Sequence, residues 1–211
     1  MLGSGVLAVW NDCEEGSEET YESWYQTEHL PERLGVPGFK RGRRYQALEG
    51  SPEYFTWYEV ESPSVLRSAD YINCLSNPTP WTKQIMSGVF LNASRTVCKR
   101  HVIAGELFGS FAITIRLETD ASDQDIQETL KATYDPTRAA RIEKWLADEK
   151  PGDEAKAEEQ IRGPDEKIKI CFILETIREE DARICAAELL KKSIRAEIGI
   201  YKLLCEYPKL L

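Results

Sequence analysis

The chain has 211 residues, of which 42% are hydrophobic and 30% are charged, and this composition excludes a disordered or low-complexity protein. Its net charge of −9 and pI near 5.0 argue against general nucleic-acid binding, because no excess of Lys and Arg is available to neutralise phosphates. The N-terminus has no basic segment and no long apolar run, so we expect no secretory signal, no membrane span and a cytoplasmic location.

Six cysteines are scattered along the sequence without a CxxC pair, and the two histidines are His29 and His101. A structural zinc site needs four clustered ligands, so we expect reduced thiols and no metal. Nucleotide-binding and serine-hydrolase chemistry have no support, because no dinucleotide fingerprint, GxxxxGK[ST] or GxSxG motif occurs.

The first half of the sequence alternates strand and helix patterns. The apolar run GVLAVW predicts a strand that ends in a turn at Asn11 and Asp12. The next helix begins near Ser17, and its regular part ends close to Leu30, with room for one more turn after Pro31. We expect strands at about residues 5–10, 39–48, 54–61 and 94–102, a helix at 17–30, and helical segments at 64–75 and 81–87.

The second half repeats this order. We expect strands at about residues 110–118, 138–147, 167–176 and 197–207, and helices at 122–134 and 178–192. The composition of RAARIEKWLA at 138–147 favours a helix, but a basic strand follows the helix and proline turn in the first half, so we predict a strand here too. The charged segment 148–165 is predicted to form an extended, partly mobile hairpin loop. This loop serves as a lid, a partner contact or a solvated insertion, and its composition favours the solvated insertion.

Two βαββαβ halves result, residues 1–105 and residues 106–211, the second with an acidic insertion at about 148–165. In such a ferredoxin-like unit the antiparallel sheet has one face covered by helices and one face open. Two open faces in one chain can close on each other. The predicted fold is therefore α+β, with two tandem ferredoxin-like repeats whose sheets pack face to face as a dimeric α+β barrel.

The stretch YESWYQTEHLPERLGVPGF, residues 21–39, carries the residues best suited to chemistry. On a helical wheel, one aromatic and acidic face spans about 140°. Its members are Tyr21, Trp24, Tyr25, Glu28, His29 and Glu32. A helix that only filled a core would carry Leu, Ile or Val there, so this face predicts the wall of a polar pocket.

His29 is the candidate general base or acid, with Tyr25, Glu28 and Glu32 orienting it from nearby positions on the same helix. In the alternative, His29 is a structural hydrogen-bonding residue that anchors the helix before Pro31. Glu28 and Glu32 also suit a paired-carboxylate role if burial separates their pKa values. They equally suit ion pairs with nearby arginines.

Further aromatic residues supply candidate ligand contacts, although core packing would also use them. The candidate substrate-binding residues are Tyr21, Trp24, Trp57, Trp81 and Arg43. Arg43 belongs to the basic cluster at 40–44, which is either a solvated face or a site for a small acidic ligand.

The segment WYQTEHLPERLGVPGF, followed by RGRRYQ and by NPTPW at residues 77–81, resembles the dimeric α+β-barrel superfamily, in particular its EthD-like members. The order of elements matches over the whole chain, and the motif lies in the first half. The resemblance implies a barrel with a pocket between sheet and helices, usually in a homodimer. Relatives include cofactor-free monooxygenases and cyclases of polycyclic aromatic compounds, lactone isomerases, haem-dependent enzymes and members without a known reaction.

Several cofactor-free relatives use a pocket histidine, and His29 is the matching residue. Haem-binding relatives place a histidine on a helix of the second repeat, and residues 108–211 contain none, which argues against haem. The first hypothesis is therefore a cofactor-independent enzyme that acts on a small aromatic or polyketide-like molecule. The second is a ligand-binding or structural barrel without catalysis, and the third is a haem enzyme that uses His29 or His101.

Overall fold

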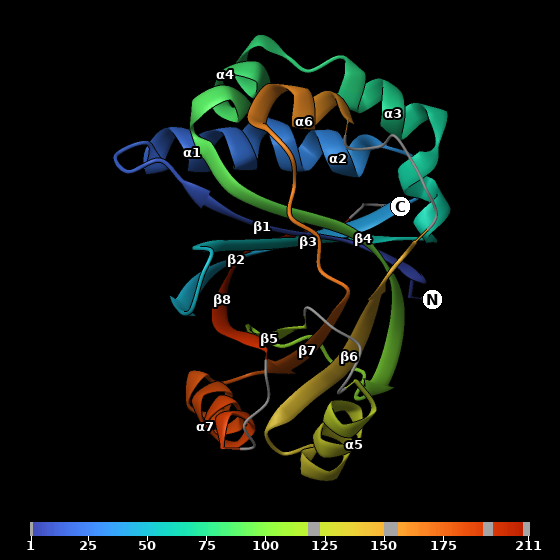
Figure 1. The fold of residues 1–211 in the computed structure, drawn as a ribbon, viewed down its shortest axis with the longest axis vertical. Coiled ribbons are helices and arrows are strands. Elements are labelled where there is room, and N and C mark those ends of the chain that lie inside the picture. Colours follow the sequence, from blue (N-terminus) through green and yellow to red (C-terminus); the bar gives the residue numbers. More distant parts are fainter. Residues whose placement is uncertain (1, 118–122, 150–155, 192–195, 209–211) are drawn as a thin grey trace.

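The strands of the protein form one closed antiparallel barrel with helices on two opposite sides (Figure 1). The computed structural model describes residues 2–117, 123–149, 156–191 and 196–208. Around the barrel the strands follow the order β1-β3-β2-β8-β5-β7-β6-β4. The predicted α+β class and the barrel are confirmed.

The elements of the first half match the predicted order. They are β1 (Gly5–Cys13), α1 (Glu18–Trp24), the π-helix η1 (Tyr25–His29), α2 (Leu30–Gly35), β2 (Phe39–Glu49), β3 (Tyr54–Val60), the 3₁₀ helix η2 (Pro63–Arg67), α3 (Ala69–Ser76), α4 (Pro80–Gly88) and β4 (Phe90–Ala104). The turn predicted at Asn11 and Asp12 is wrong, because these residues pair with Tyr54 and Leu91 and extend β1. The helical path also continues past Pro31, which occupies the first turn of α2, where proline is tolerated.

The second half contains β5 (Phe111–Leu117), α5 (Asp123–Thr133), β6 (Ala139–Ala147), α6 (Lys156–Arg162), β7 (Ile170–Thr176), α7 (Glu179–Leu190) and β8 (Glu197–Pro208). The strand predicted at 138–147 is confirmed as β6. Burial on both faces overrides its helical composition: Trp145 lies in the barrel interior, and Ile142 packs in the core of the second half.

The prediction of an extended loop at 148–165 is wrong for residues 156–162, which form α6. Residues 150–155 lie outside the described part of the chain. Ala157 and Ile161 of α6, one helical turn apart, pack against the hydrophobic core of the first half. Figure 1 accordingly shows α6 with the helices of the first half, where it contacts α3 and α4, although its sequence belongs to the second half.

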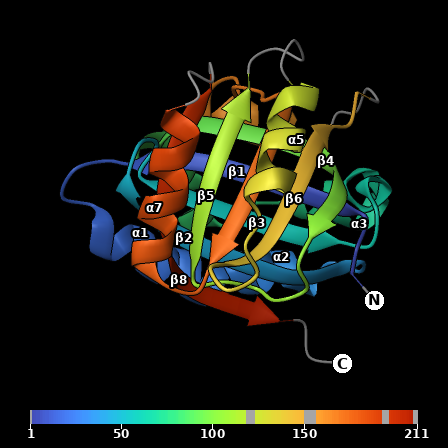
Figure 2. The same ribbon diagram turned by 90° about the horizontal axis from the view of Figure 1, so that it is seen from below.

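Each half contributes four adjacent strands, in the orders β4-β1-β3-β2 and β8-β5-β7-β6. These orders are consistent with two ferredoxin-like sheets. Hydrogen-bonded pairing of β2 with β8 and of β4 with β6 closes the barrel at both seams. Helices α5 and α7 cover the outer face of the second half (Figure 2), and the other helices cover the first. The helices of the first half approach the sheet closely at Gly42, where a Cβ atom would lie 2.6 Å from Leu30 Cδ1.

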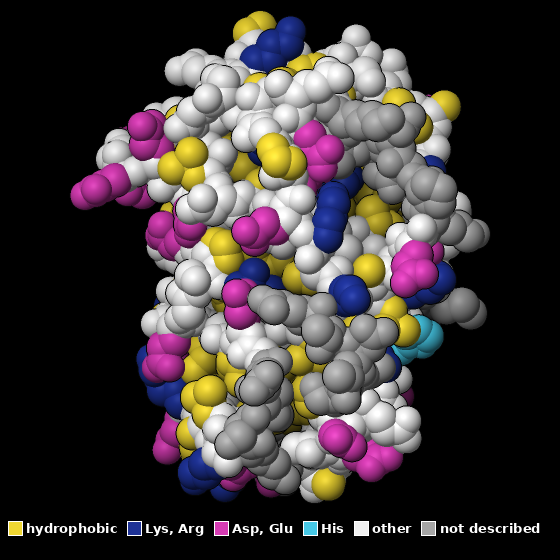
Figure 3. Space-filling view, viewed as in Figure 1, with side chains coloured by type: hydrophobic (Ala, Val, Ile, Leu, Met, Phe, Trp, Pro, Cys, Tyr) yellow, Lys and Arg dark blue, Asp and Glu magenta, His cyan; other side chains and the backbone are white. Residues whose placement is uncertain are grey.

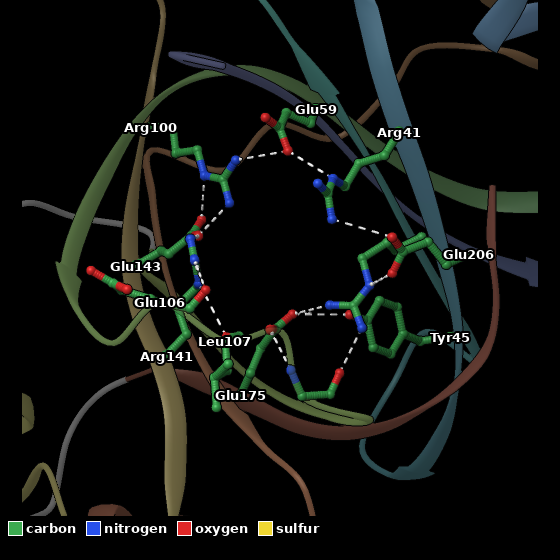
Figure 4. Close-up of polar contacts among 12 residues, drawn as sticks. Arg41, Tyr45, Glu59, Arg100, Glu106, Leu107, Arg141, Glu143, Glu175 and Glu206 are labelled. Atoms are coloured by element: carbon green, nitrogen blue, oxygen red, sulfur yellow. Dashed lines mark hydrogen bonds and ion pairs between the residues drawn. The ribbon is translucent and has the colours of Figure 1, made fainter. Parts of the chain in front are cut away.

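The barrel interior contains many aromatic side chains, and one part of it holds a ring of ion-paired charged groups (Figure 4). We call the charged group the charge ring; its members are Arg41, Arg43, Arg100, Arg141, Glu59, Glu143, Glu175 and Glu206. Arg43 Nη1 lies 2.5 Å from Glu175 Oε1, and Arg100 pairs with both Glu143 and Glu59. The ring of Phe108 lies among these groups, with the guanidinium carbons of Arg41 and Arg141 each 4.3 Å from its centroid.

Over the described side chains of the face in Figure 3, acidic and basic groups are interspersed without a broad basic area. Within the described ranges, no helix combines the length and apolar character needed to cross a membrane.

Replacement of a charge-ring carboxylate should be much more destabilising than loss of a surface ion pair. Glu143 accepts from Arg100, from Arg141 Nη1 at 2.9 Å and from Trp145 Nε1 at 2.8 Å. Because Glu143→Gln leaves buried guanidinium charge uncompensated, we expect a loss of about 3–5 kcal/mol in the free energy of unfolding, measured by urea denaturation at neutral pH.

The matched control is Glu197→Gln, which removes the 2.6 Å pair of Arg116 with a 64% exposed carboxylate. We expect it to cost less than about 1 kcal/mol. Equal losses in the two variants would show that the ring is not a stability determinant.

Candidate functional site

The candidate site begins with a π-turn in the first helix. Residues Tyr25–His29 form this turn between α1 and α2, and its i→i+5 hydrogen bonding adds one residue to the helical path. The addition rotates everything after it by about 100° relative to a regular helix. As a result Arg33 is buried, while Glu32, which the regular wheel placed on the pocket face, is half-buried. Single π-turns of this kind are frequent at functional sites.

His29 is buried, with 6% of its surface exposed. The centroid of its ring lies 4.3 Å from that of Trp24 and 5.0 Å from that of Tyr25. Its Nδ1 atom is buried and has no hydrogen-bond partner among the described residues. Burial, assisted by the positive charge of Arg33, lowers the pKa of His29 well below its ordinary value. The imidazole is therefore neutral at physiological pH.

Beside His29 lies a cavity of about 20 Å³, which we call the His29 cavity. A volume of about 10–15 Å³ already admits one water molecule, so the cavity has room for roughly one. Its apolar and aromatic walls are Leu7, Val9, Tyr25, Tyr58, Tyr71, Met86 and Phe90. Its charged walls are Arg33, Arg95, Glu158 and Arg162. The cavity thus lies between the sheet and the helices of the first half, with α6 as an additional wall.

Glu158 of α6 lies among the three arginines of the cavity. Its Oε1 is 2.8 Å from Arg33 Nη2, and its Oε2 is 3.2 Å from Arg162 Nη1 and 4.0 Å from Arg95 Nε. Burial alone would raise the pKa of this carboxyl, but the charges of Arg33, Arg162 and Arg95 lower it to about 2. Glu158 is therefore ionised, and the polar end of the cavity is fully charged.

Glu28 and Glu32, predicted to orient His29, make other contacts. Glu28 Oε1 accepts hydrogen bonds from the hydroxyls of Thr79 at 2.5 Å and Thr82 at 2.8 Å, which ties the π-turn to the start of α4. Glu32 lies 3.3 Å from Arg33 Nη1, and burial raises its pKa. Neither residue lines the His29 cavity.

The predicted binding residues divide into two groups. Tyr25 lines the cavity, Trp24 packs against His29 with its ring tilted by 32°, and Tyr21 packs behind Tyr25 with 5.5 Å between ring centroids. Trp81 is half-buried on α4 and contacts the same hydrophobic core.

Arg43 and Trp57 instead lie in the barrel interior, on the opposite face of the sheet from the His29 cavity. The Arg43 guanidinium carbon is 5.8 Å from the centroid of the Trp57 ring, and Arg43 belongs to the charge ring. The structure therefore does not bring these two residues to His29.

Sequence reasoning missed Arg95, Glu158 and Arg162 as cavity residues. A usable signal was present in KAEEQIR, where Ala157 and Ile161, and likewise Glu158 and Arg162, are four residues apart. This spacing is typical of a helix with one apolar and one ion-paired side. The position of that helix on the first half could not be read from the pattern.

A wider depression of about 380 Å³ lies beside Lys99 and His101, away from the predicted residues. Its basic groups Arg67 and Lys99 pair with Asp148 at 2.9 and 3.4 Å, and the depression is open to solvent. No group of three or more His, Cys, Asp or Glu side chains within the described ranges is arranged to hold a metal ion. The His29 cavity combines an unpartnered titratable atom with enclosure, so we take it as the candidate site.

Comparison with known proteins relates the fold to solved structures. No protein-family model matches the chain, and no curated protein sequence matches it. A proposed monooxygenase from Fusobacterium nucleatum has a TM-score of 0.58 at 10% identity, covering 99% of this chain and 96% of its own. An anthrone oxidase-like protein has a TM-score of 0.56 at 8% identity, covering 97% and 92%. A haem-binding protein from Thermus thermophilus has a TM-score of 0.50 at 10% identity, with the same coverage of 97% and 92%. These neighbours have the dimeric α+β-barrel fold, and the likeness concerns the fold alone.

The buried, neutral His29 should make stability depend on pH in a defined window. The unfolded chain binds a proton on His29 near the ordinary pKa of 6.5, whereas the folded chain does not until far lower pH. Stability is therefore lost as pH falls below that value. We expect wild type to lose about 1.2 kcal/mol relative to His29→Asn between pH 6 and 5.

The measurement is urea denaturation of both proteins across this range. His101→Asn is the matched control, because it removes the exposed histidine by the same substitution and should follow wild type. A parallel pH dependence of wild type and His29→Asn would refute the buried neutral state.

Proposed function

We propose that the chain is a monooxygenase-like α+β-barrel enzyme in which His29 acts as a general base on a small aromatic or polyketide-like molecule. The observation that carries this proposal is a neutral imidazole whose buried Nδ1 has no hydrogen-bond partner among the described residues, in a residue that lines a cavity with charged and aromatic walls. The fold neighbours named as a proposed monooxygenase and as anthrone oxidase-like support the same class of chemistry. We also infer that the two halves are tandem ferredoxin-like repeats of the EthD-like kind.

The proposed chemical step is proton abstraction. The Nδ1 lone pair accepts a proton from an acidic C–H or O–H group, and the electron pair stays on the substrate as an enolate or phenolate. The guanidinium group of Arg33, fixed on α2, stabilises the developing negative charge in a site of low dielectric constant. This step is common to monooxygenase-, cyclase- and isomerase-like reactions and requires no cofactor.

Substrate access depends on α6. The His29 cavity has room for about one water, so a substrate binds when Glu158 and Arg162 leave their places in its wall. Helix α6 is seven residues long, and Ala157 and Ile161 are its apolar contacts with the first half. Because such a short helix loses few apolar contacts when it separates from the first half, it can move and open the wall of the cavity.

A second candidate function is a non-catalytic barrel in which His29 is structural. The close packing of His29 against Trp24 and the small volume of the cavity beside it favour this alternative. A haem enzyme is not supported by the residues present. The cavity at His29 is far smaller than a porphyrin and has an ionic wall, and His101 is an exposed residue of β4.

Oxygen consumption with anthrone and related polycyclic phenols as probes tests the enzyme proposal. We expect turnover by wild type and a loss of about 10²–10⁴-fold in kcat for His29→Asn, the usual contribution of a general base. KM should change little, because the substitution removes the base and leaves the cavity walls in place. His101→Asn should retain wild-type turnover.

The structural alternative gives a different pattern. It predicts no turnover of any probe by either protein and a large decrease in the melting temperature of His29→Asn. That result would show that His29 is not a catalytic residue.

A further inference from the structure

Glu158 reaches the His29 cavity from outside the first half. Helix α6, which carries Glu158, lies on the helices of the first half (Figure 1). The Glu158 side chain points inward from this helix, and only 7% of the residue is exposed. There the carboxylate contacts Arg33, Arg162 and Arg95 at 2.8, 3.2 and 4.0 Å. Of these, Arg33 on α2 and Arg95 on β4 belong to the first half, whereas Arg162 belongs to α6. The fixed walls of the cavity therefore supply two guanidinium groups for one carboxylate.

The charges of this cluster balance only when a carboxylate is present between the arginines. Within the described residues, Arg33 also pairs with Glu32 at 3.3 Å and Arg162 with Asp165 at 2.6 Å, while Arg95 donates to the Tyr71 hydroxyl, which is not a carboxylate, at 2.9 Å. Without Glu158, three guanidinium groups would face two carboxylates. A buried net positive charge is costly, so the cluster requires one monoanion at this position.

The remaining walls of the His29 cavity suit the aromatic part of a ligand that also carries a negative charge. Tyr58, Tyr71 and Phe90 offer aromatic surfaces next to the arginines, and Met86 adds an apolar, adaptable contact. Guanidinium groups recognise carboxylates through paired, charge-assisted hydrogen bonds. The cavity therefore has an anion-binding end and an aromatic end.

We infer that Arg33 and Arg95 form an anion subsite that the chain's own Glu158 occupies, and that the ligand of the His29 cavity is an aromatic carboxylic acid whose carboxylate replaces that of Glu158. The inference rests on the proposed function in taking this cavity as the binding site, and it names the substrate class. Glu158 is then an internal competitor. Because it is attached to the chain, it competes at the high effective concentration of a tethered group, and free carboxylates bind wild type weakly.

Chemical rescue tests the subsite. Glu158→Ala removes the internal carboxylate, and we expect a lowered melting temperature that sodium acetate raises by several degrees more than sodium chloride of equal ionic strength. Acetamide, the neutral analogue, should have no such effect. The matched control is Glu159→Ala, which removes a carboxylate from the same helix that pairs with Lys167 at 3.6 Å, outside the cavity. Acetate should not rescue this variant beyond the effect of chloride.

Benzoate tests the aromatic end. By titration calorimetry we expect benzoate to bind Glu158→Ala at least about tenfold more tightly than wild type, because the tethered competitor is gone. Benzamide should not show this gain. If Glu158→Ala does not fold, the same titration on Glu158→Gln, which retains the shape of the side chain, decides the question. Acetate rescue no larger than that of chloride, or equal benzoate affinity in a folded Glu158 variant and wild type, overturns the inference.

The two proposals fail in different ways. Benzoate binding should persist when His29→Asn is added to the Glu158 variant, because the anion subsite does not use the imidazole. Retained binding without His29-dependent turnover would reject the general-base function and keep the subsite. Absence of carboxylate binding in a protein that still shows His29-dependent turnover would reject the subsite alone.

Discussion

Closure of the barrel depends on guanidinium–carboxylate pairs buried in its interior. Arg43 of β2 pairs with Glu175 of β7, and Arg100 of β4 pairs with Glu143 of β6, so both pairs join a strand of the first half to one of the second. A slip of one residue in any of these strands would turn its charged residue to the other face of the sheet, away from its partner. An ion left alone in the interior costs several kcal/mol, and the ring therefore selects one register at the seams.

The same ring also fixes the segment that joins the halves. Phe108 lies between β4 and β5, and its ring is surrounded by guanidinium groups of the charge ring. The backbone next to it is held as well: Gly109 N donates to Glu175 Oε2 at 2.9 Å, and Gly109 O accepts from Arg43 Nη2 at 2.6 Å. Because the linker, the seams and the barrel interior share these contacts, we expect the two halves to fold as one unit.

The sequence predicted those parts of the structure in which local pattern and burial agree. The order of elements in the first half, where a basic strand follows the helix and its proline turn, was enough to place β6 as a strand against its composition. Two features were beyond that reasoning. A regular 100° wheel cannot register the extra residue at Tyr25–His29, and the acidic composition of 148–165 gave no sign that Glu158 is buried among arginines of the other half. Both errors concern the candidate site, and functional sites are where a structure most often departs from what local sequence preferences predict.

These two features are physically connected. In a regular helix, Glu32 would face the sheet beside His29, and its carboxylate would form part of the cavity wall. The extra residue of the π-turn places Arg33 at that position instead. The guanidinium group of Arg33 is buried next to the neutral His29 and near Arg95, so it needs a carboxylate as a partner. The described residues of the first half place no carboxylate between Arg33 and Arg95 in the cavity wall. Helix α6 supplies this carboxylate as Glu158, and Ala157 and Ile161 hold the helix in place. The π-turn that buries Arg33 beside the His29 cavity thus also explains why the charged helix α6 packs against the first half of the chain.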